Sequence, residues 1–244
     1  MKWRSLQEST AAPDTRPLRE QFAERKALIE KLVPAELTTV HRQVVEDLRK
    51  SGIAKRSLQT GAKAPDFTLP DQNGKLFSST ELLQQRRLIL CFIRGRWDPF
   101  CCGQMEAMNE LLPSFDQAGA TVVAISPQTV KHSYFMHDQH HLRFPLLSDA
   151  GNQVARQFGI VYQVPNTPPT NQQDIYRRVF INLPNTNGDA SWELPIPATY
   201  ILDHDGTILY AAANPDYTER PEPAEILERL LSSDIRQNSQ APNT

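Results

Sequence analysis

The residues best suited to chemistry are two adjacent cysteines, Cys101 and Cys102, which follow a short apolar segment. The run Leu88–Ile93 is rich in branched side chains and lacks Pro and Gly, which predicts a buried β-strand. Pro99 suits the first turn of a helix, because its missing N–H needs no partner there. Both cysteines therefore fall in the first helical turn, where the helix dipole and unpaired backbone N–H groups favour a thiolate. The sequence predicts a reactive thiol at this junction.

The three cysteines differ in their suitability for this role. Cys91 lies mid-strand between apolar neighbours, where a cysteine acts as a small hydrophobic residue. Cys102 points about 100° around the helix from Cys101, so we predict Cys101 as the nucleophile. Arg94 and Arg96 lie close to it in the sequence and are the expected sources of positive charge. An odd, small number of cysteines indicates a reducing compartment, and we expect the cytoplasm.

The elements that must position this junction alternate between strands and helices. We expect the cysteine helix to continue to about residue 117 and a second apolar strand over 120–126, one βαβ unit later. The remaining predicted elements are a hairpin around Asn73-Gly74, helices over 80–83, 130–141, 152–158 and 223–232, and strands over 144–148, 198–203 and 207–212. The pattern predicts an α/β fold, with a central mixed sheet and helices on both faces.

Two segments are predicted to lack regular structure. Residues 162–195 are polar and rich in proline, which predicts a long loop that is either functional or loosely ordered. The tail from Gln237 is predicted to be disordered.

Residues 1–58 are predicted to form a helical extension that precedes a main domain over 59–244. Apolar residues recur at helical spacing on both sides of Pro34, and the second helix ends near Gly52. Both helices are amphipathic, so we expect them to pack against the main domain or a second subunit, which makes a homodimer possible. We predict a surface or interface position for His41 on the second helix.

Composition excludes several partners. The 28 acidic residues nearly balance the 26 basic ones, and the net charge of −2 creates no field that attracts nucleic acid or an anionic membrane. The longest apolar run has six residues, too few to span a membrane, and the first ten residues lack the apolar core of a secretory signal. No Gly-rich phosphate loop is present, so we expect no cofactor.

A histidine cluster raises the question of a metal. We interpret these residues as a solvated helix face, because no cysteine or well-spaced carboxylate pair completes a site. The four residues are His132, His137, His140 and His141.

Several segments together resemble the alkyl hydroperoxide reductase/thiol-specific antioxidant (AhpC/TSA) family, in a peroxiredoxin-like branch. The resemblance covers most of the chain, including the helical extension, and its order and spacing are specific. It implies a thioredoxin-like fold. The matching segments are GAKAPDFTLP at 61–70, FIRGRWDPFC at 92–101, AISPQ at 124–128, FPLLSD at 144–149, SWELP at 191–195 and PATYILDHDG at 197–206.

The resemblance also implies roles for site residues. The peroxide-attacking cysteine of the family begins the helix after this strand, which places it at Cys101. Asp98 stands where the family has Thr or Ser, or in this branch often Cys. Pro197 corresponds to a thioredoxin-type cis-proline that faces the cysteine. Because Pro197 falls where a second arginine is often found, Arg94, Arg96 or Arg143 would supply that charge. Trp97, Phe100 and Trp192 are expected to wall the pocket.

Asp98 is the departure that matters most for the chemistry. At about 5 Å its charge would oppose a thiolate by about 3 kcal/mol, and the helix N-terminus with one arginine would offset a similar amount. We favour a role for Asp98 in capping the helix and pairing with Arg94 or Arg96. The alternative is a catalytic role, in which the carboxylate accepts a hydrogen bond from the peroxide.

The implied function is a thiol-dependent peroxidase acting on hydrogen peroxide or organic hydroperoxides. Cys101 would attack the terminal peroxide oxygen and become a sulfenic acid. An external thiol, such as thioredoxin or a low-molecular-weight thiol, would reduce it, because a disulfide between adjacent Cys101 and Cys102 is strained. Two alternatives remain. One is a thiol–disulfide oxidoreductase, although the Cys-x-x-Cys pair is missing. The other is a thioredoxin-fold binding protein that has lost catalysis, which Asp98 favours.

Overall fold

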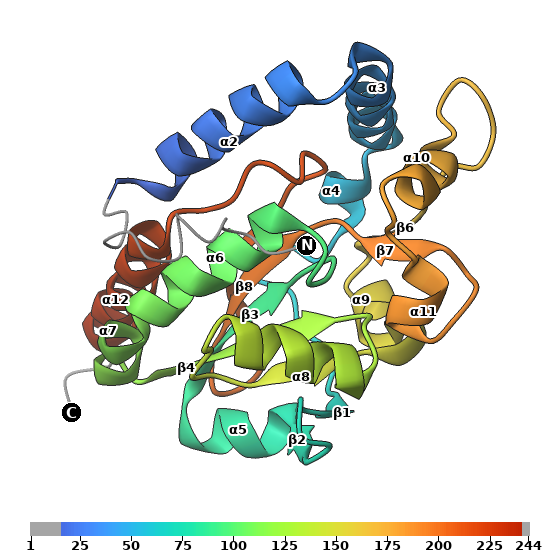
Figure 1. Cartoon of the computed structure of the whole chain (residues 1–244). Coiled ribbons are helices and arrows are strands. Elements are labelled where there is room, and N and C mark those ends of the chain that lie inside the picture. Colours follow the sequence, from blue (N-terminus) through green and yellow to red (C-terminus); the bar gives the residue numbers. More distant parts are fainter. Residues whose placement is uncertain (1–15, 241–244) are drawn as a thin grey trace.

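The computed structural model describes residues 16–240, with side chains described up to residue 232. Its centre is a five-stranded sheet in the order β5-β4-β3-β8-β9 (Figure 1). Strands β3, β4 and β5 are parallel, while β8 and β9 are antiparallel to their neighbours, which confirms the predicted mixed sheet. The sheet strands are β3 (Arg87–Phe92), β4 (Ala120–Ser126), β5 (Leu146–Ser148), β8 (Ala198–Leu202) and β9 (Ile208–Ala213).

The other described elements surround this sheet. The helices are α2 (Leu18–Leu32), α3 (Ala35–Ser51), α4 (Ile53–Arg56), α5 (Ser79–Gln85), α6 (Pro99–Glu110), α7 (Leu112–Gln117), α8 (Val130–Gln139), the 3-10 turn η1 (Ala150–Asn152), α9 (Gln153–Gln157), α10 (Gln172–Arg178), α11 (Leu183–Asn187) and α12 (Pro223–Gln240). Two antiparallel hairpins complete the fold, β1 (Thr68–Pro70) with β2 (Leu76–Ser78) and β6 (Val161–Gln163) with β7 (Glu193–Pro195).

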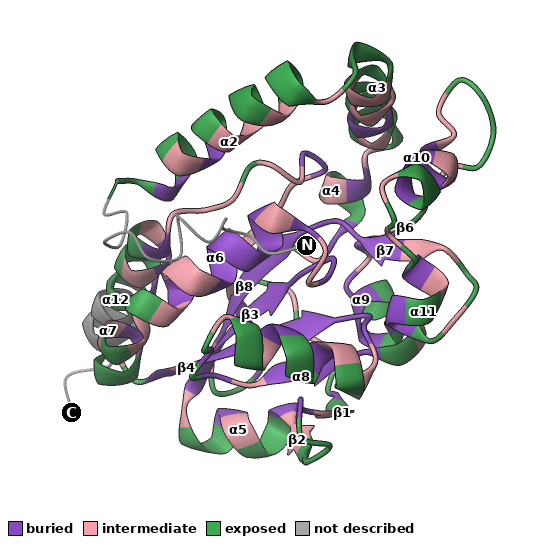
Figure 2. Cartoon of the chain, viewed as in Figure 1, coloured by how far each residue is buried: buried purple, intermediate pink, exposed green. Residues whose placement is uncertain are grey.

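Strand β3 divides its side chains between two apolar cores, because successive residues of a strand point to opposite faces. Ile89 and Cys91 pack with side chains of α6, α7, α8 and α12 on one face. Leu88 and Leu90 pack with side chains of α4, α5 and α9 on the other. The sheet strands are therefore buried on both sides (Figure 2), and the prediction of helices on both faces is confirmed.

The two predicted N-terminal helices are confirmed as α2 and α3. Pro34 precedes α3, and Gly52 ends it in the left-handed conformation at φ 69°, which a glycine adopts without a Cβ clash. Phe22 of α2 lies in the same core as α6. The carboxylate of Glu222 accepts hydrogen bonds from the N–H groups of Leu18 and Arg19, which caps α2 from the far end of the chain. The extension thus packs against its own main domain.

Two expectations about element boundaries are corrected. The cysteine helix does not run unbroken to 117, because Pro113 disrupts helical pairing and separates α6 from α7 at Leu111. The final helix α12 extends to Gln240, so the tail predicted to be disordered from Gln237 begins as helix, and residues 241–244 lie outside the described residues.

None of the described helices has the length and apolar character that crossing a membrane requires.

The segment 162–195 is also more ordered than predicted. It holds α10, α11 and most of the β6–β7 hairpin instead of one long loop. Asn171 and Asn182 accept hydrogen bonds from backbone N–H groups at the start of α10 and α11, respectively. Asparagine favours helix N-caps as well as turns, so the same residue types are compatible with both structures.

Candidate active site

Cys101 lies in the first turn of α6, as the sequence predicts, and it has no solvent exposure. Asp98 is the N-cap residue, and its Oδ1 accepts a hydrogen bond from the N–H of Phe100 at 2.9 Å. The capping role favoured for Asp98 is therefore confirmed. Pro99 occupies the first position of the helix, where its missing N–H costs nothing. Asp98 and Pro99 thus define the start of α6 and place Cys101 in its first turn.

The sulfur of Cys101 has three polar neighbours. The thiol donates a hydrogen bond to Oδ2 of Asp98 at 3.2 Å. The backbone N–H of Arg94 and Nη2 of Arg220 point at the sulfur, at 3.4 Å and 3.5 Å. The thiol thus lies between a carboxylate that accepts its hydrogen bond and two donors that would stabilise negative charge on sulfur.

The surroundings raise the pKa of Cys101 to about 11. Burial is the largest cause, and the charge of Asp98 is the second. Arg220, Arg94 and the N–H of Arg94 act in the opposite direction without cancelling them. Asp98 lies nearer than the separation of about 5 Å expected from helical spacing, so its opposition to a thiolate is stronger than expected. At neutral pH Cys101 rests as a thiol.

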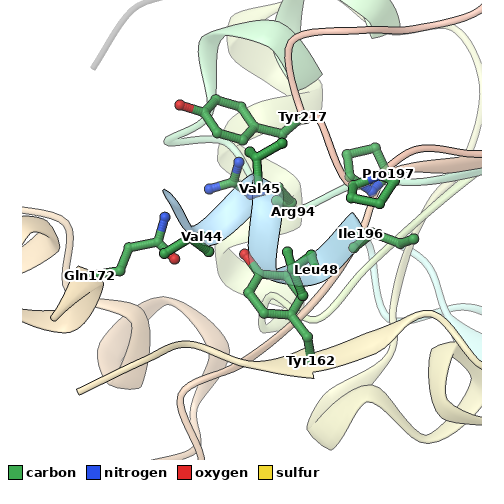
Figure 3. Close-up of a pocket in the computed structure, with 10 residues that line it drawn as sticks. Val44, Val45, Leu48, Arg94, Tyr162, Gln172, Ile196, Pro197 and Tyr217 are labelled. Carbon is green, nitrogen blue, oxygen red and sulfur yellow. The ribbon is translucent and has the colours of Figure 1, made fainter. Parts of the chain in front are cut away.

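Arg94 is a buried cation beneath the N-terminal helices, with a side chain only 3% exposed. Its Nη1 lies 3.5 Å from Oδ2 of Asp98, which places the predicted pairing in the structure. Its Nη2 donates to the hydroxyl of Tyr176 at 2.6 Å, and its guanidinium stacks on Tyr217 at 4.2 Å from the ring centre. Figure 3 shows this guanidinium beside Tyr217 and Val45 of α3.

Arg220 is a site residue that the sequence did not reveal. It lies in the segment 214–222 that joins β9 to α12. Its Nε donates to Oε1 of Gln104 at 2.9 Å, and its Nη2 lies 3.9 Å from Oδ2 of Asp98. Arg220 therefore provides the second positive charge beside Cys101, a role for which the sequence offers Arg94, Arg96 and Arg143. No spacing pattern relates position 220 to position 101, and only the fold brings them together.

Arg96 and Arg143 do not reach the thiol. The guanidinium of Arg96 lies over the ring of Phe135, 5.7 Å from its centre. Arg143 is tied to Asn109 through its backbone N–H and its guanidinium. The expectation that either would supply charge to Cys101 is wrong, because the side chain of Arg96 is engaged with Phe135 of α8 and that of Arg143 with Asn109 of α6.

Pro197 also departs from the expectation. The peptide bond before it is not cis, and in the described residues the cis bond precedes Pro169. Pro197 lines a small cavity with Arg94, as Figure 3 shows, and its carbonyl accepts a hydrogen bond from Asn214. The resemblance to a cis-proline strand thus places Pro197 near the site without the cis bond.

His41 lies over the site, packed against two tyrosines, and not on an outer surface. Its ring centre is 6.1 Å from those of both Tyr176 and Tyr217, and its Nδ1 pairs with Nε2 of Gln172 at 2.9 Å. Burial, followed by the charge of Arg94, lowers the pKa of His41 to about 4. The helical extension therefore contributes a neutral imidazole to the roof of the site.

The predicted aromatic walls are confirmed in part. Trp97 and Phe100 line the cavity above the site. Trp192 instead packs with a separate small core around Val164 and Leu183, and its ring faces Arg177. Trp192 directly precedes strand β7, which pairs with β6.

The histidines of α8 and its C-terminus do not converge. His140 pairs with Glu106 at 3.0 Å, and its side chain is 5% exposed, so it is packed against α6 and not solvated as predicted. His132 packs against the ring of Phe135. Across the described residues, no group of three or more His, Cys, Asp or Glu side chains is arranged to hold a metal ion.

The other two cysteines are buried and lie outside any disulfide. Cys102 donates from Sγ to the carbonyl of Arg96 at 3.4 Å, and burial raises its pKa well above the ordinary value. Cys91 lies within β3, where burial raises its pKa to about 12. Neither shares the arrangement of donors around Cys101.

Sequence comparisons find relatives that are named as peroxiredoxins. A putative peroxiredoxin of Mycobacterium tuberculosis is 30% identical over 157 residues, which cover 64% of this chain and 86% of the relative. The chloroplastic peroxiredoxin Q of Arabidopsis thaliana is 29% identical over 175 residues, 70% of this chain and 68% of the relative.

A solved structure and a family model complete the comparison. The crystal structure of the peroxidoxin BcpB from Mycobacterium tuberculosis superimposes with a TM-score of 0.56 at 23% identity, over 72% of this chain and 97% of that one, which confirms the thioredoxin-like fold. The model of the AhpC/TSA family matches residues 60–211. Since this match spans more than half of the chain, the protein belongs to the AhpC/TSA family.

Proposed function

We propose that the protein is a thiol peroxidase that reduces hydroperoxides through Cys101. The observation that carries the proposal is the position of its buried sulfur, in contact with the Asp98 carboxylate on one side and with Arg220 and the N–H of Arg94 on the other. A proton acceptor beside a nucleophile and cations beside a developing oxyanion are what peroxide cleavage requires. The names of the relatives, peroxiredoxins, support the same activity.

In the proposed reaction, Asp98 moves the proton. The thiol proton passes to Oδ2 of Asp98 as sulfur attacks the terminal oxygen, so that the S–O bond forms while the O–O bond breaks. Arg94 and Arg220 stabilise the negative charge on the leaving oxygen. That oxygen then takes the proton from Asp98 and leaves as an alcohol or water. The products are the sulfenic acid of Cys101 and one reduced peroxide, and the carboxylate is restored.

An external thiol completes the proposed cycle. It condenses with the sulfenic acid, which releases water and forms a mixed disulfide, and a second thiol then regenerates Cys101. Cys102 is hydrogen-bonded to the carbonyl of Arg96 and is adjacent to Cys101 in the sequence, where a disulfide would be strained. Cys91 lies within β3, so neither cysteine is placed to resolve the intermediate. We propose thioredoxin or a low-molecular-weight thiol as reductant. Three free thiols suit a reducing compartment such as the cytoplasm. A homodimer remains a prediction.

A second candidate is a binding protein of the same fold that has lost catalysis. The observation that favours it is the raised pKa of Cys101, because a thiol is a far weaker nucleophile than a thiolate. The two candidates differ in one respect that can be measured. The peroxidase needs Asp98 to accept the proton during attack, whereas the binding protein has no use for the contact between Cys101 and Asp98.

The test is the reaction of the reduced protein with one equivalent of hydroperoxide, followed by thiol counting after denaturation and by dimedone trapping with mass spectrometry. We expect the number of free thiols to fall from three to two, with the dimedone adduct on Cys101. Cys101→Ser should abolish the reaction, and Cys91→Ala should retain it as the matched control. A rate no faster than that of free cysteine, or an adduct on Cys91 or Cys102, would refute the peroxidase.

A further inference from the structure

Helix α10 brings one tyrosine to the site from the segment 162–195. Tyr176 is 2% exposed, and its ring centre lies 5.2 Å from that of Trp97. One turn earlier on the same helix, Nε2 of Gln172 pairs with Nδ1 of His41 on α3 at 2.9 Å. Helix α10 is thus fixed against α3 (Figure 1), and the hydroxyl of Tyr176 has a defined position beside the site.

The guanidinium of Arg94 has one short polar contact and one long one. Its Nη2 donates to the hydroxyl of Tyr176 at 2.6 Å. Its Nη1 lies 3.5 Å from Oδ2 of Asp98, beyond the range of about 2.7–2.9 Å that is typical of a charge-assisted hydrogen bond. A buried arginine beside a carboxylate gains from closing such a gap, because a direct bond offsets the cost of burying both charges. The tyrosine hydroxyl, and not the carboxylate, is therefore the closer partner of this cation.

Asp98 keeps an oxygen for the thiol because neither nearby arginine bonds to it directly. Its Oδ2 accepts the hydrogen bond of Cys101 at 3.2 Å, while Nη1 of Arg94 and Nη2 of Arg220 lie 3.5 Å and 3.9 Å away. Arg220 is itself bonded elsewhere, to Oε1 of Gln104 at 2.9 Å. A carboxylate bonded directly to a guanidinium is a weaker proton acceptor, since the cation stabilises its charged form. The distances at Asp98 thus suit an acceptor for the thiol proton.

We propose that Tyr176 is a positioning residue, which holds the guanidinium of Arg94 away from Asp98 and so leaves Oδ2 of Asp98 to the thiol of Cys101. Burial raises the pKa of Tyr176 well above its ordinary value, so the hydroxyl stays neutral and adds no charge to the site. This role gives the segment 162–195 a part in the site. The expected effect on turnover rests on the proposed peroxidase function, whereas the expected effect on the thiol does not.

The first test measures the thiol and does not depend on catalysis. Tyr176→Phe keeps the ring and removes the hydroxyl, so Arg94 should move onto Asp98 and offset part of its charge. The pKa of Cys101, which the charge of Asp98 raises, should then fall by about half a unit. Alkylation of Cys101 by iodoacetamide at pH 7, followed by mass spectrometry, should accelerate by about threefold. An unchanged or higher midpoint of the alkylation pH profile would overturn the proposal.

The matched control for this test is Tyr200→Phe. Tyr200 is also fully buried, but it lies in the core on the opposite face of the sheet. The alkylation midpoint of this variant should equal that of the wild type. Where Tyr176→Phe unfolds, Tyr176→Met removes the same hydroxyl and takes its place.

The second test shows whether the effect passes through Arg94. In the Arg94→Met background, Tyr176→Phe should move the alkylation midpoint by less than about 0.2 units, because no guanidinium remains to shift. A shift as large as in the wild-type background would mean that the hydroxyl acts through the packing of α10, and it would overturn the positioning role.

The third test measures turnover. Tyr176→Phe should lower the rate of peroxide reduction by about tenfold while alkylation accelerates, because Asp98 then accepts the thiol proton less readily. A rise in both rates would overturn the proposal. If the wild-type protein reduces peroxide no faster than free cysteine, the peroxidase is refuted, and the alkylation midpoints still decide the role of Tyr176.

Discussion

An arginine–aspartate pair lies near each end of strand β3, and the two pairs differ in how closely their charged atoms approach each other. At its start, Nε of Arg87 donates to Oδ1 of Asp203 at 2.9 Å, within the range of a charge-assisted hydrogen bond. Just beyond its end, Nη1 of Arg94 lies 3.5 Å from Oδ2 of Asp98. That oxygen is shared with the thiol of Cys101 and lies near Arg220.

The difference separates a structural ion pair from one open to a ligand. The first pair is short and direct, so its two charges compensate each other within the fold. The second leaves one donor of Arg94, Nε, without a hydrogen-bond partner in the described structure, which costs stability that a bound ligand would recover. We therefore expect the pair at the start of β3 to serve structure and the pair beyond its end to serve the proposed chemistry.

The largest expected effect is a double dissociation between the two arginines. Arg94→Met should lower the rate of peroxide reduction by about 10²- to 10³-fold, because the leaving oxygen loses a cation. Arg87→Met should leave that rate unchanged and lower the free energy of unfolding by about 2 kcal/mol, because the partly buried carboxylate of Asp203 loses this charge-assisted hydrogen bond. Stopped-flow rates and urea denaturation measure the two quantities.

The contrast depends on the partners that remain. After Arg94→Met, Asp98 still has Arg220 within 3.9 Å, so the loss of unfolding free energy should be smaller than for Arg87→Met. Loss of activity in folded Arg87→Met, or full activity in Arg94→Met, would contradict the division between a structural pair and a catalytic one.

The pair beside Cys101 was partly predictable because part of it is local. The apolar run of β3, Pro99 as a helix start and Asp98 as a cap all lie within a few residues, and local propensity determines such short-range geometry. The hairpin, the sheet strands and both N-terminal helices follow from the same kind of signal.

The rest of the site depends on contacts between distant parts of the chain. Arg220 meets Cys101 across 119 positions, and Tyr176 meets Arg94 across 82. His41 reaches Gln172 across 131 positions, from a helix whose amphipathic pattern does not show what its inner face covers. No spacing in a single sequence encodes these pairings, since tertiary packing creates them. For the same reason, the guanidinium of Arg96 lies over Phe135 and not beside Cys101, although Arg96 is close to Cys101 in the sequence.

Asp98→Thr removes the negative charge beside Cys101 and keeps a side-chain oxygen at that position. Removal of the carboxylate takes away the second cause of the raised pKa of Cys101, so this pKa should fall by about one to two units while burial still holds it above the ordinary value. Alkylation by iodoacetamide at pH 7 should accelerate, and the midpoint of its pH profile should move to lower pH.

Peroxide reduction by Asp98→Thr should not accelerate in parallel with alkylation. The variant has more thiolate but lacks the group that carries the proton to the leaving oxygen. The rate constant of peroxide reduction divided by that of alkylation therefore falls if Asp98 acts as proposed. An equal rise in both rates would show that the carboxylate only suppresses the thiolate, and an unchanged alkylation midpoint would contradict the charge effect.

The charge of Arg94 should also be visible in the pH dependence of stability. Burial and Arg94 lower the pKa of His41 to about 4 from an ordinary value of 6.5 in the unfolded chain. The unfolded state therefore binds this proton first as pH falls, and stability is lost between about pH 6.5 and pH 4, by up to about 2 kcal/mol at pH 5. His41→Gln should remove this component, as measured by urea denaturation at pH 7 and pH 5. A histidine at position 41 that titrates near 6.5 by NMR would contradict it.

The smallest effect concerns the capping of α6 by Asp98. The pair of Arg87 and Asp203 has no such capping role. Oδ1 of Asp98 caps α6 through the N–H of Phe100, and threonine can supply the same acceptor, whereas alanine cannot. Asp98→Ala and Asp98→Thr remove the same charge, so their difference in unfolding free energy reports the cap alone. We expect Asp98→Ala to be less stable than Asp98→Thr by about 1 kcal/mol in urea denaturation, with similar thiol pKa values in both. Equal stability would mean that the start of α6 is held by the packing of Phe100 and Cys101, and that the carboxylate serves the chemistry alone.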